Sequence, residues 1–197
     1  MPTGRPREFD LDERLDRAMR VFWRLGYEGA GMAELTEAMG ISRPSLYAAY
    51  GNKEELFRKA VERYAAGPAR HVDEALREPT ARAAAERLLR GAAEVTTSPD
   101  NPSAGCLIVQ GALATGTAAA GPRAELAARR RETEELLRER FERAREEGEL
   151  PSDADLADLA RYVTTVAYGL SVQAADGATR ADLLRTVDTA LRCWPTA

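Results

Sequence analysis

The feature that most constrains this 197-residue chain is a pair of short helical segments that meet at a glycine-containing turn. Apolar residues predict one helix over about 32–39 and another over 43–50, with the turn at 39–42 between them. Ser42 is expected to cap the second helix, and Pro44 suits its first turn, where no N–H group is required. Two short helices joined in this way and packed on a longer one form a helix-turn-helix.

Longer helices are expected on both sides of this pair. Before it, apolar residues recur at helical spacing from Leu11 to Leu25, and Gly26 is expected to end that helix because glycine tolerates the left-handed conformation. After it, Gly51 breaks the pattern, and Asn52 with Glu55 is typical of a capping box. The first 60 residues are therefore predicted to form four helices.

The segment 43–50 has two faces of different chemistry. One is expected to pack on the first helix and holds Leu46, Ala49 and Tyr50. The other is expected to point outward and holds Arg43, Ser45, Tyr47 and Ala48. Arginine can hydrogen-bond guanine or phosphate, and hydroxyl groups can reach phosphate oxygens. The outward face therefore suits the major groove of DNA.

Basic residues beside this segment extend the predicted DNA surface. Lys53 stands at the start of the fourth helix, where the helix dipole also favours phosphate. Arg5 and Arg7 lie in a polar N-terminal arm that could follow the DNA backbone or enter the minor groove. The net charge of −4 comes from the chain after residue 60, because residues 1–60 carry ten basic and ten acidic side chains.

The remainder of the chain is expected to be helical as well. Apolar periodicity predicts helical segments at 69–77, after a kink, and at 80–97, 105–117 and 122–147. Two more helices are expected to begin at capping pairs: one is capped by Ser152 and Asp155 and runs to 175, and the other is capped by Thr179 and Asp182 and runs to 193. Turn residues predict a loop at 97–103. No segment alternates with a period of two for long enough to indicate a strand. The fold class is therefore all-α.

Composition narrows the functional classes. Two distant cysteines, Cys106 and Cys193, do not make a disulfide framework, and no window is apolar enough to span a bilayer. We therefore expect a cytoplasmic protein that does not associate with membranes. No nucleophile–base pair, phosphate loop or metal-ligand spacing occurs, so we expect neither an enzyme, nor a cofactor, nor a metal site.

The N-terminal motif resembles that of the TetR family of transcriptional regulators. The resemblance rests on the runs 26–29, 35–42 and 45–57 and on the opening Gly4-Arg5-Pro6-Arg7. Carried over by position, the DNA-contact residues that the family implies are Thr36, Arg43, Pro44, Ser45, Tyr47 and Lys53. One departure is Ala30-Gly31, where the family commonly has a serine or threonine that meets a phosphate.

The resemblance implies a helix-turn-helix domain at 1–52 and a helical regulatory domain at 53–197. A single helix-turn-helix binds one half-site weakly, so a homodimer on a palindromic operator is expected. The last two helices are the candidate interface, with the residues Leu156, Val163, Val166, Gly169, Leu170, Leu184, Val187 and Leu191. An unknown small-molecule effector is expected in a cavity lined by Tyr64, His71, Cys106, Gln110 and Phe141.

Several alternatives stay open at this level. The chain could be a TetR-like activator instead of a repressor, a helical scaffold without DNA binding, or an unrelated small helical enzyme. His71, the only histidine, is expected on the surface or in the ligand cavity. Cys106 lies in an apolar stretch and is read mainly as a small buried hydrophobe, with redox sensing as the alternative.

Overall fold

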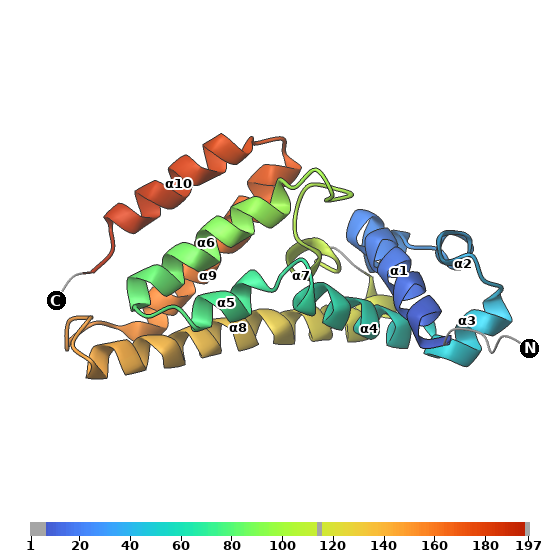
Figure 1. Cartoon of the computed structure of the whole chain (residues 1–197), viewed down its shortest axis with the longest axis horizontal. Coiled ribbons are helices and arrows are strands. Elements are labelled where there is room, and N and C mark those ends of the chain that lie inside the picture. Colours follow the sequence, from blue (N-terminus) through green and yellow to red (C-terminus); the bar gives the residue numbers. More distant parts are fainter. Residues whose placement is uncertain (1–6, 114–115, 196–197) are drawn as a thin grey trace, which may run out of the picture.

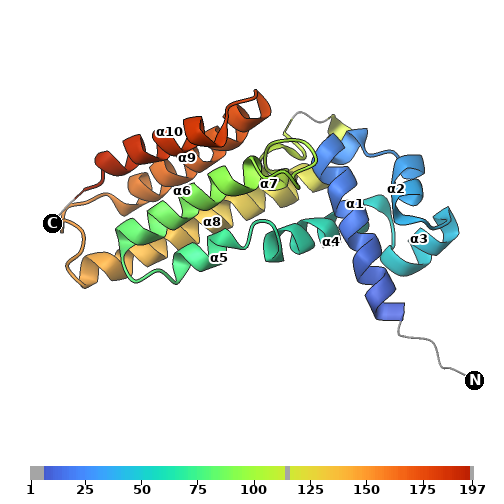
Figure 2. The ribbon, with the colours of Figure 1, turned by 45° about the horizontal axis from the view of Figure 1, so that its top comes forward.

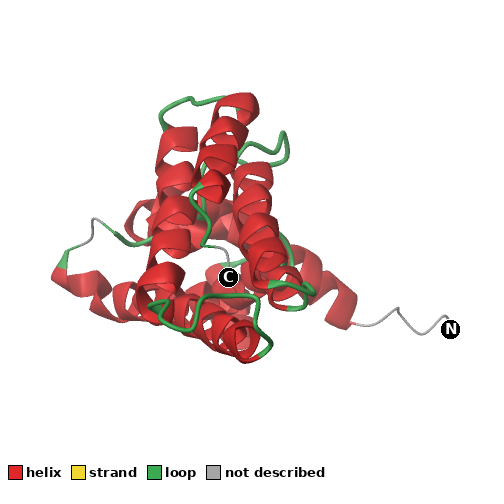
Figure 3. Ribbon diagram, turned by 90° about the vertical axis from the view of Figure 1, so that its left-hand side faces the viewer, coloured by secondary structure: helices red, strands yellow, loops and turns green. Residues whose placement is uncertain are grey.

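The computed structural model describes residues 7–113 and 116–195, and its regular structure in these two ranges is entirely helical (Figure 3). The molecule is elongated, with the N-terminal helices at one end and the C-terminal helices at the other (Figure 1). The long helix α8 (Ala120–Glu146) runs along most of this length. The predicted all-α class is confirmed.

The N-terminal end holds the predicted helix-turn-helix. It consists of α1 (Arg7–Gly29), α2 (Met32–Met39), α3 (Arg43–Tyr50) and α4 (Lys53–Ala66). Gly26 interrupts α1 with φ of 68°, and Gly40 ends α2 with φ of 63°, so both glycines occupy the left-handed region that other residues rarely adopt. The sequence therefore places these two breaks correctly.

Side-chain caps fix the starts of α3 and α4. The Ser42 hydroxyl accepts a hydrogen bond from the Ser45 N–H at 3.3 Å. Asn52 and Glu55 form the expected capping box, in which each side chain accepts the other residue's N–H at 2.9 Å. Because a cap satisfies N–H groups that have no partner in the first turn, these contacts hold the recognition segment in register.

The C-terminal end holds α5 (His71–Leu76), α6 (Ala81–Thr96), α7 (Leu107–Gln110), the 3-10 turn η1 (Thr117–Ala119), α8, α9 (Leu156–Ala175) and α10 (Arg180–Arg192). Helices α6 and α9 lie side by side, and α8 packs against α9 (Figure 2). No helix in the described ranges is long and apolar enough to cross a membrane.

Two helix predictions need correction. The segment 105–117 does not form one helix, because only Leu107–Gln110 is α-helical and a turn follows at Gly111. This stretch is rich in glycine, which favours turns over helices. The start of α9 is capped by Asp155, which accepts the Asp158 N–H at 3.0 Å, and not by the pair Ser152 and Asp155.

An aromatic cluster holds α1 against α4. The Phe22 and Phe57 rings meet edge to face at 5.0 Å, and Tyr27 meets Phe57 in the same way at 5.2 Å. Further along α4, Tyr64 meets Trp23 of α1 at 4.7 Å. The guanidinium of Arg63 adds a two-pronged hydrogen bond to Asp16, with distances of 2.7 and 2.9 Å. The helix-turn-helix is therefore built on the same core as α4.

Candidate functional site

Helix α3 presents its polar face to solvent. Arg43, Pro44 and Ser45 are exposed, and the Tyr47 side chain is 49% exposed. Leu46 and Tyr50 are buried against the core, as the sequence predicts. Ala49, which was expected to pack inward, is exposed instead. The polar side chains of Arg43, Ser45 and Tyr47 thus project from a helix that is anchored to the core by Leu46 and Tyr50.

Backbone-directed hydrogen bonds fix α2 and α3 on α1. The Tyr50 hydroxyl donates to the Leu11 carbonyl at 2.7 Å, and the Arg14 guanidinium donates to the Gly40 carbonyl at 3.1 Å. The first bond holds the end of α3, and the second satisfies a carbonyl at the end of α2. Because three helices are joined in this way, the outward face of α3 has a defined orientation.

Two predicted DNA-contact residues are less exposed than α3. Thr36 is half-buried, and its hydroxyl donates to its own helix, at 2.9 Å from the Met32 carbonyl. Lys53 is also half-buried, and its ammonium lies 4.5 Å from the centre of the Tyr27 ring. Burial lowers the pKa of Lys53, although the nearby Glu28 and Glu34 carboxylates act in the opposite direction. Both residues lie beside the α3 surface, and both are only partly exposed to solvent.

The start of α2 borders this surface as well. Arg5 lies outside the described residues, and α1 begins at Arg7. Gly31 caps α2 without a side chain, and its N–H donates to the Glu34 carboxylate at 3.0 Å. That N–H is therefore already paired with a carboxylate of its own helix.

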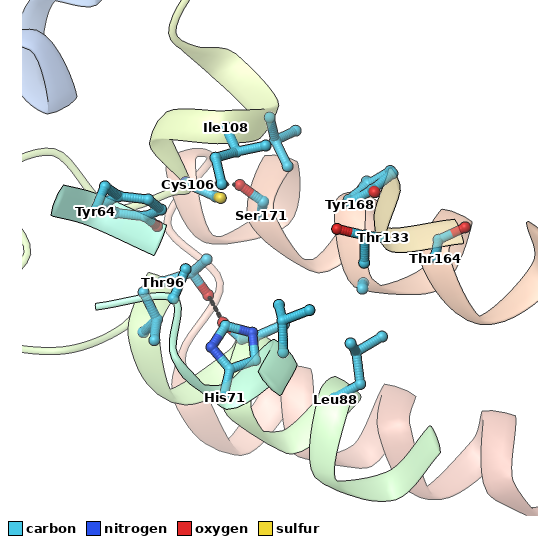
Figure 4. A pocket seen from close by; sticks show the side chains of 16 residues that line it. Tyr64, His71, Leu88, Thr96, Cys106, Ile108, Thr133, Thr164, Tyr168 and Ser171 are labelled. Atoms are coloured by element: carbon cyan, nitrogen blue, oxygen red, sulfur yellow. Dashed lines mark hydrogen bonds between the residues drawn. The ribbon is translucent and has the colours of Figure 1, made fainter. Parts of the chain in front are cut away.

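A cavity of about 60 Å³ lies among the C-terminal helices α5 to α9, with α4 closing it on the side of the N-terminal helices. Tyr64 of α4, His71 of α5 and Cys106, just before α7, line it as predicted (Figure 4). A further wall, which was not predicted, comes from α9 and contributes Thr164, Ala167, Tyr168 and Ser171. Helical periodicity places these residues on an inner face of α9, but it does not reveal which helices enclose a space with it.

Two of the five predicted ligand residues do not line this cavity. Phe141 is fully buried in the C-terminal core, where its ring meets Trp194 at 5.5 Å. The Gln110 amide lies near the Ser171 carbonyl at 3.4 Å, behind the cavity wall. These two expectations are wrong because both side chains are used in packing between helices.

Burial controls the ionisation of the cavity residues. It lowers the pKa of His71 from 6.5 to about 4, against the opposing effect of the Pro68 carbonyl and of nearby carboxylates. It raises the pKa of the Cys106 thiol and raises that of Tyr64 well above 10. The imidazole, the thiol and the phenol are therefore all neutral at physiological pH.

The wall of the cavity is hydrogen-bonded directly to α1. The Trp23 indole N–H donates to the Gly105 carbonyl at 3.0 Å, and the Ser103 hydroxyl donates to the Trp23 carbonyl at 3.0 Å. The Tyr27 N–H donates to the Gly111 carbonyl at 2.8 Å. The segment that carries Cys106 is thus held at both ends by the helix that supports α2 and α3.

Most of the predicted dimer-interface residues face the core of their own protomer. Leu156, Val163, Leu170, Val187 and Leu191 are each at most 5% exposed. Periodicity identifies an apolar face but does not say whether the same chain or a partner covers it, and these five side chains are covered by their own chain. Val166 and Leu184 are half-buried, and Gly169 is exposed.

An apolar stripe on the outer side of α9 contains Val166 and Gly169 of the predicted interface together with two residues that were not predicted, Tyr162 and Val172. Tyr162 is 42% exposed and Val172 is 43% exposed. Gly169 lies between them with open space where a side chain would be. With the half-buried Val166, these residues are spaced by three or four positions and share one face of the helix.

Comparison with known proteins identifies the chain. The family described as "Bacterial regulatory proteins, tetR family" matches residues 15–60, and "Tetracyclin repressor-like, C-terminal domain" matches residues 82–189. The chain belongs to the TetR family. It is a DNA-binding transcriptional regulator, as the exposed face of α3 and the family assignment together indicate.

Individual relatives of this TetR-family chain cover nearly its whole length. The HTH-type transcriptional repressor ComR of Escherichia coli is 34% identical over 194 residues, which cover 98% of this chain and 92% of the relative. A cysteine mutant of the TetR family regulator CifR, solved with 26-base-pair operator DNA, is 47% identical with a TM-score of 0.91 and covers 97% of this chain and 100% of its own.

A third relative is a regulator described as a putative TetR protein of Rhodococcus sp. RHA1. It is 41% identical with a TM-score of 0.65, and the match covers 93% of this chain and 98% of the neighbour. Within the described residues of this TetR-family chain, no cluster of three or more His, Cys, Asp or Glu side chains could hold a metal ion.

The neutral His71 makes stability depend on pH. Unfolded histidine binds a proton below pH 6.5, whereas the buried imidazole resists protonation until about pH 4. The free energy of unfolding should therefore rise with pH between 4 and 6.5, by up to about 3 kcal/mol. Since His71 is the only histidine, an NMR titration of its ring reads this pKa directly.

The control for this titration is His71→Gln, which removes the titrating group and should flatten the pH dependence of unfolding in that interval. A ring that titrates near pH 6.5 in the folded protein would contradict the prediction.

Proposed function

We propose that this chain is a repressor that binds a palindromic operator as a homodimer and releases it when a small molecule occupies the cavity. The observation that carries the proposal is the exposed polar face of α3, with Arg43, Ser45 and Tyr47 outward and Leu46 buried behind them. Helices presented in this way read base edges and phosphates in the major groove. The relative CifR was solved in complex with operator DNA, and ComR is named a repressor.

We assign roles to the residues of this DNA surface. Arg43 and Pro44 begin α3 and would lie nearest the base edges, while Ser45 and Tyr47 would donate to phosphate oxygens. Thr36 and Lys53 would contact phosphate at the border of the surface, and Arg5, together with Arg7 at the start of α1, would add charge along the backbone. The proposed division of the chain is 1–52 for DNA reading and 53–197 for regulation.

A dimer is required because one α3 covers only one half-site. Two recognition helices must stand about 34–36 Å apart, or a multiple of this distance, to enter successive major-groove faces. We propose that the outer stripe of α9 forms the interface, with Tyr162, Val166, Gly169 and Val172 joined by Leu184 of α10. Its exposed apolar side chains and the small Gly169 favour close approach of a second helix.

Release of the operator would follow from the contacts that join the cavity to α4 and α1. Tyr64 links the cavity to α4, and the hydrogen bonds from Trp23 and Tyr27 link its other wall to α1. A molecule that fits best when these helices tilt would favour a dimer whose two α3 helices no longer match the operator. In this proposal, α4 and α1 together transmit the effect of the bound molecule to the two α3 helices.

Replacing Tyr47 tests the DNA surface. Tyr47→Ala removes an exposed ring and hydroxyl without opening the core, so the thermal midpoint should stay unchanged while operator affinity falls roughly 10- to 100-fold. Fluorescence anisotropy with labelled operator DNA measures the affinity. Leu136→Ala, which trims a 37% exposed apolar residue on α8, is the matched control and should bind normally. Equal affinity of Tyr47→Ala and the parent protein would refute the assignment.

Replacing Val172 tests the dimer face. Val172→Asp places a charge on the outer stripe of α9, where a partner helix would exclude water. Sedimentation should show a dimer for the parent protein and a 21.5 kDa monomer for the variant, with loss of operator binding. Leu136→Asp places the same charge on α8 and should leave the dimer intact. A dimer that survives Val172→Asp would place the interface elsewhere.

A further inference from the structure

The cavity contains two buried polar atoms without a hydrogen-bond partner, the Tyr64 hydroxyl oxygen and His71 Nδ1. Tyr64 has no exposed surface, and its ring is held by Trp23 at 4.7 Å. Figure 4 shows Tyr64 and His71 bordering the same space, with Cys106 beside it. Buried polar groups in folded proteins are nearly always hydrogen-bonded, so each exception calls for a physical reason, such as a missing ligand.

The other hydroxyl groups of the cavity wall already have hydrogen-bond partners of ordinary geometry. Three threonines donate to carbonyls of their own helices: Thr96 to Ala92, Thr133 to Arg129 and Thr164 to Ala160. The Ser171 hydroxyl accepts the Cys106 N–H at 2.8 Å, and the Tyr168 hydroxyl donates to the Arg130 carbonyl at 3.1 Å. Among the described lining residues, the unpaired buried atoms are thus those of Tyr64 and His71.

The wall carries no formal charge. None of the described residues that line the cavity is an aspartate, glutamate, lysine or arginine, and burial keeps the His71 imidazole neutral. Most of the remaining wall is apolar and includes Val72, Leu88 and Val95. A charged molecule would lose its hydration here without gaining a counter-ion, which is strongly unfavourable.

A surface groove of about 300 Å³ adjoins the cavity between α4, α5 and α8. Ala69, Val72, Ile108 and Thr133 line both spaces, so the cavity and the groove share part of one wall. The groove is bordered by three acidic residues, Glu62, Asp73 and Glu132, and by one basic residue, Arg129. This excess of negative charge disfavours the approach of anions.

We propose that the cavity binds a compact, uncharged molecule with an apolar body and one oxygen or nitrogen atom that pairs with the Tyr64 hydroxyl and His71. The cavity of about 60 Å³ is well below the roughly 300–1,000 Å³ of pockets for drug-sized ligands, so the molecule is small. This inference rests on the proposed function for the cavity's regulatory role, and it specifies the chemical class of the effector.

The experiment uses the full chain and probes of matched size. Butanone, butyrate and butylammonium share a short apolar body but differ in charge. Long-range ¹H–¹⁵N spectra of the single histidine report directly on His71 Nδ1. Saturable shifts of this nitrogen are expected with butanone, and no saturable shift is expected with either ion.

Two variants locate the binding atom. Tyr64→Phe removes an unpaired hydroxyl, so the fold should persist, and the affinity for butanone should fall about tenfold because one hydrogen bond is lost. Tyr168→Phe is the matched control, since its hydroxyl lines the same cavity but is already bonded to Arg130, and it should bind butanone as the parent does.

Three results would each overturn the proposal: no saturable shift with butanone up to its solubility, equal shifts with butyrate or butylammonium, or unchanged affinity in Tyr64→Phe. Operator binding by the protein alone is measured separately by anisotropy. Loss of that activity would reject the proposed repressor function, while the butanone titration would still report on the chemistry of the cavity.

Discussion

The indole of Trp23 joins the two halves of the molecule. Its N–H donates to the Gly105 carbonyl, and its ring meets Tyr64, so one side chain of α1 contacts both α4 and the segment that carries Cys106. The helix that supports the recognition surface is therefore part of the cavity's surroundings. The cavity thus shares direct packing and hydrogen-bond contacts with α1 and α4.

At the recognition surface, local sequence signals determine most of the helix boundaries. Gly26 and Gly40 adopt left-handed conformations, and Ser42 and Asn52 cap the helices that follow, so short-range rules locate α1 to α4. The outward direction of Arg43, Ser45 and Tyr47 follows from the same periodicity. Lys53 was expected to contact phosphate, and its ammonium lies over the Tyr27 ring, a contact that depends on how α1 meets α4.

The cavity and the dimer face depend on long-range packing, which the sequence alone does not specify. Tyr64, His71 and Cys106 were predicted to line the cavity and do so, whereas Phe141 packs on Trp194 and Gln110 lies near Ser171. Apolar residues of α9 and α10 were assigned to a partner, but most of them fill the protomer's own core. Periodicity defines a face, and only the packed structure shows what covers it.

If α1 joins the cavity wall to the DNA surface, operator binding must restrict the wall, because coupling between two sites is reciprocal. Hydrogen–deuterium exchange of the dimer with and without operator DNA measures this directly. The account predicts slower exchange in two separated regions, residues 30–53 at the DNA and residues 103–111 at the cavity. Protection confined to residues 30–53 would contradict it.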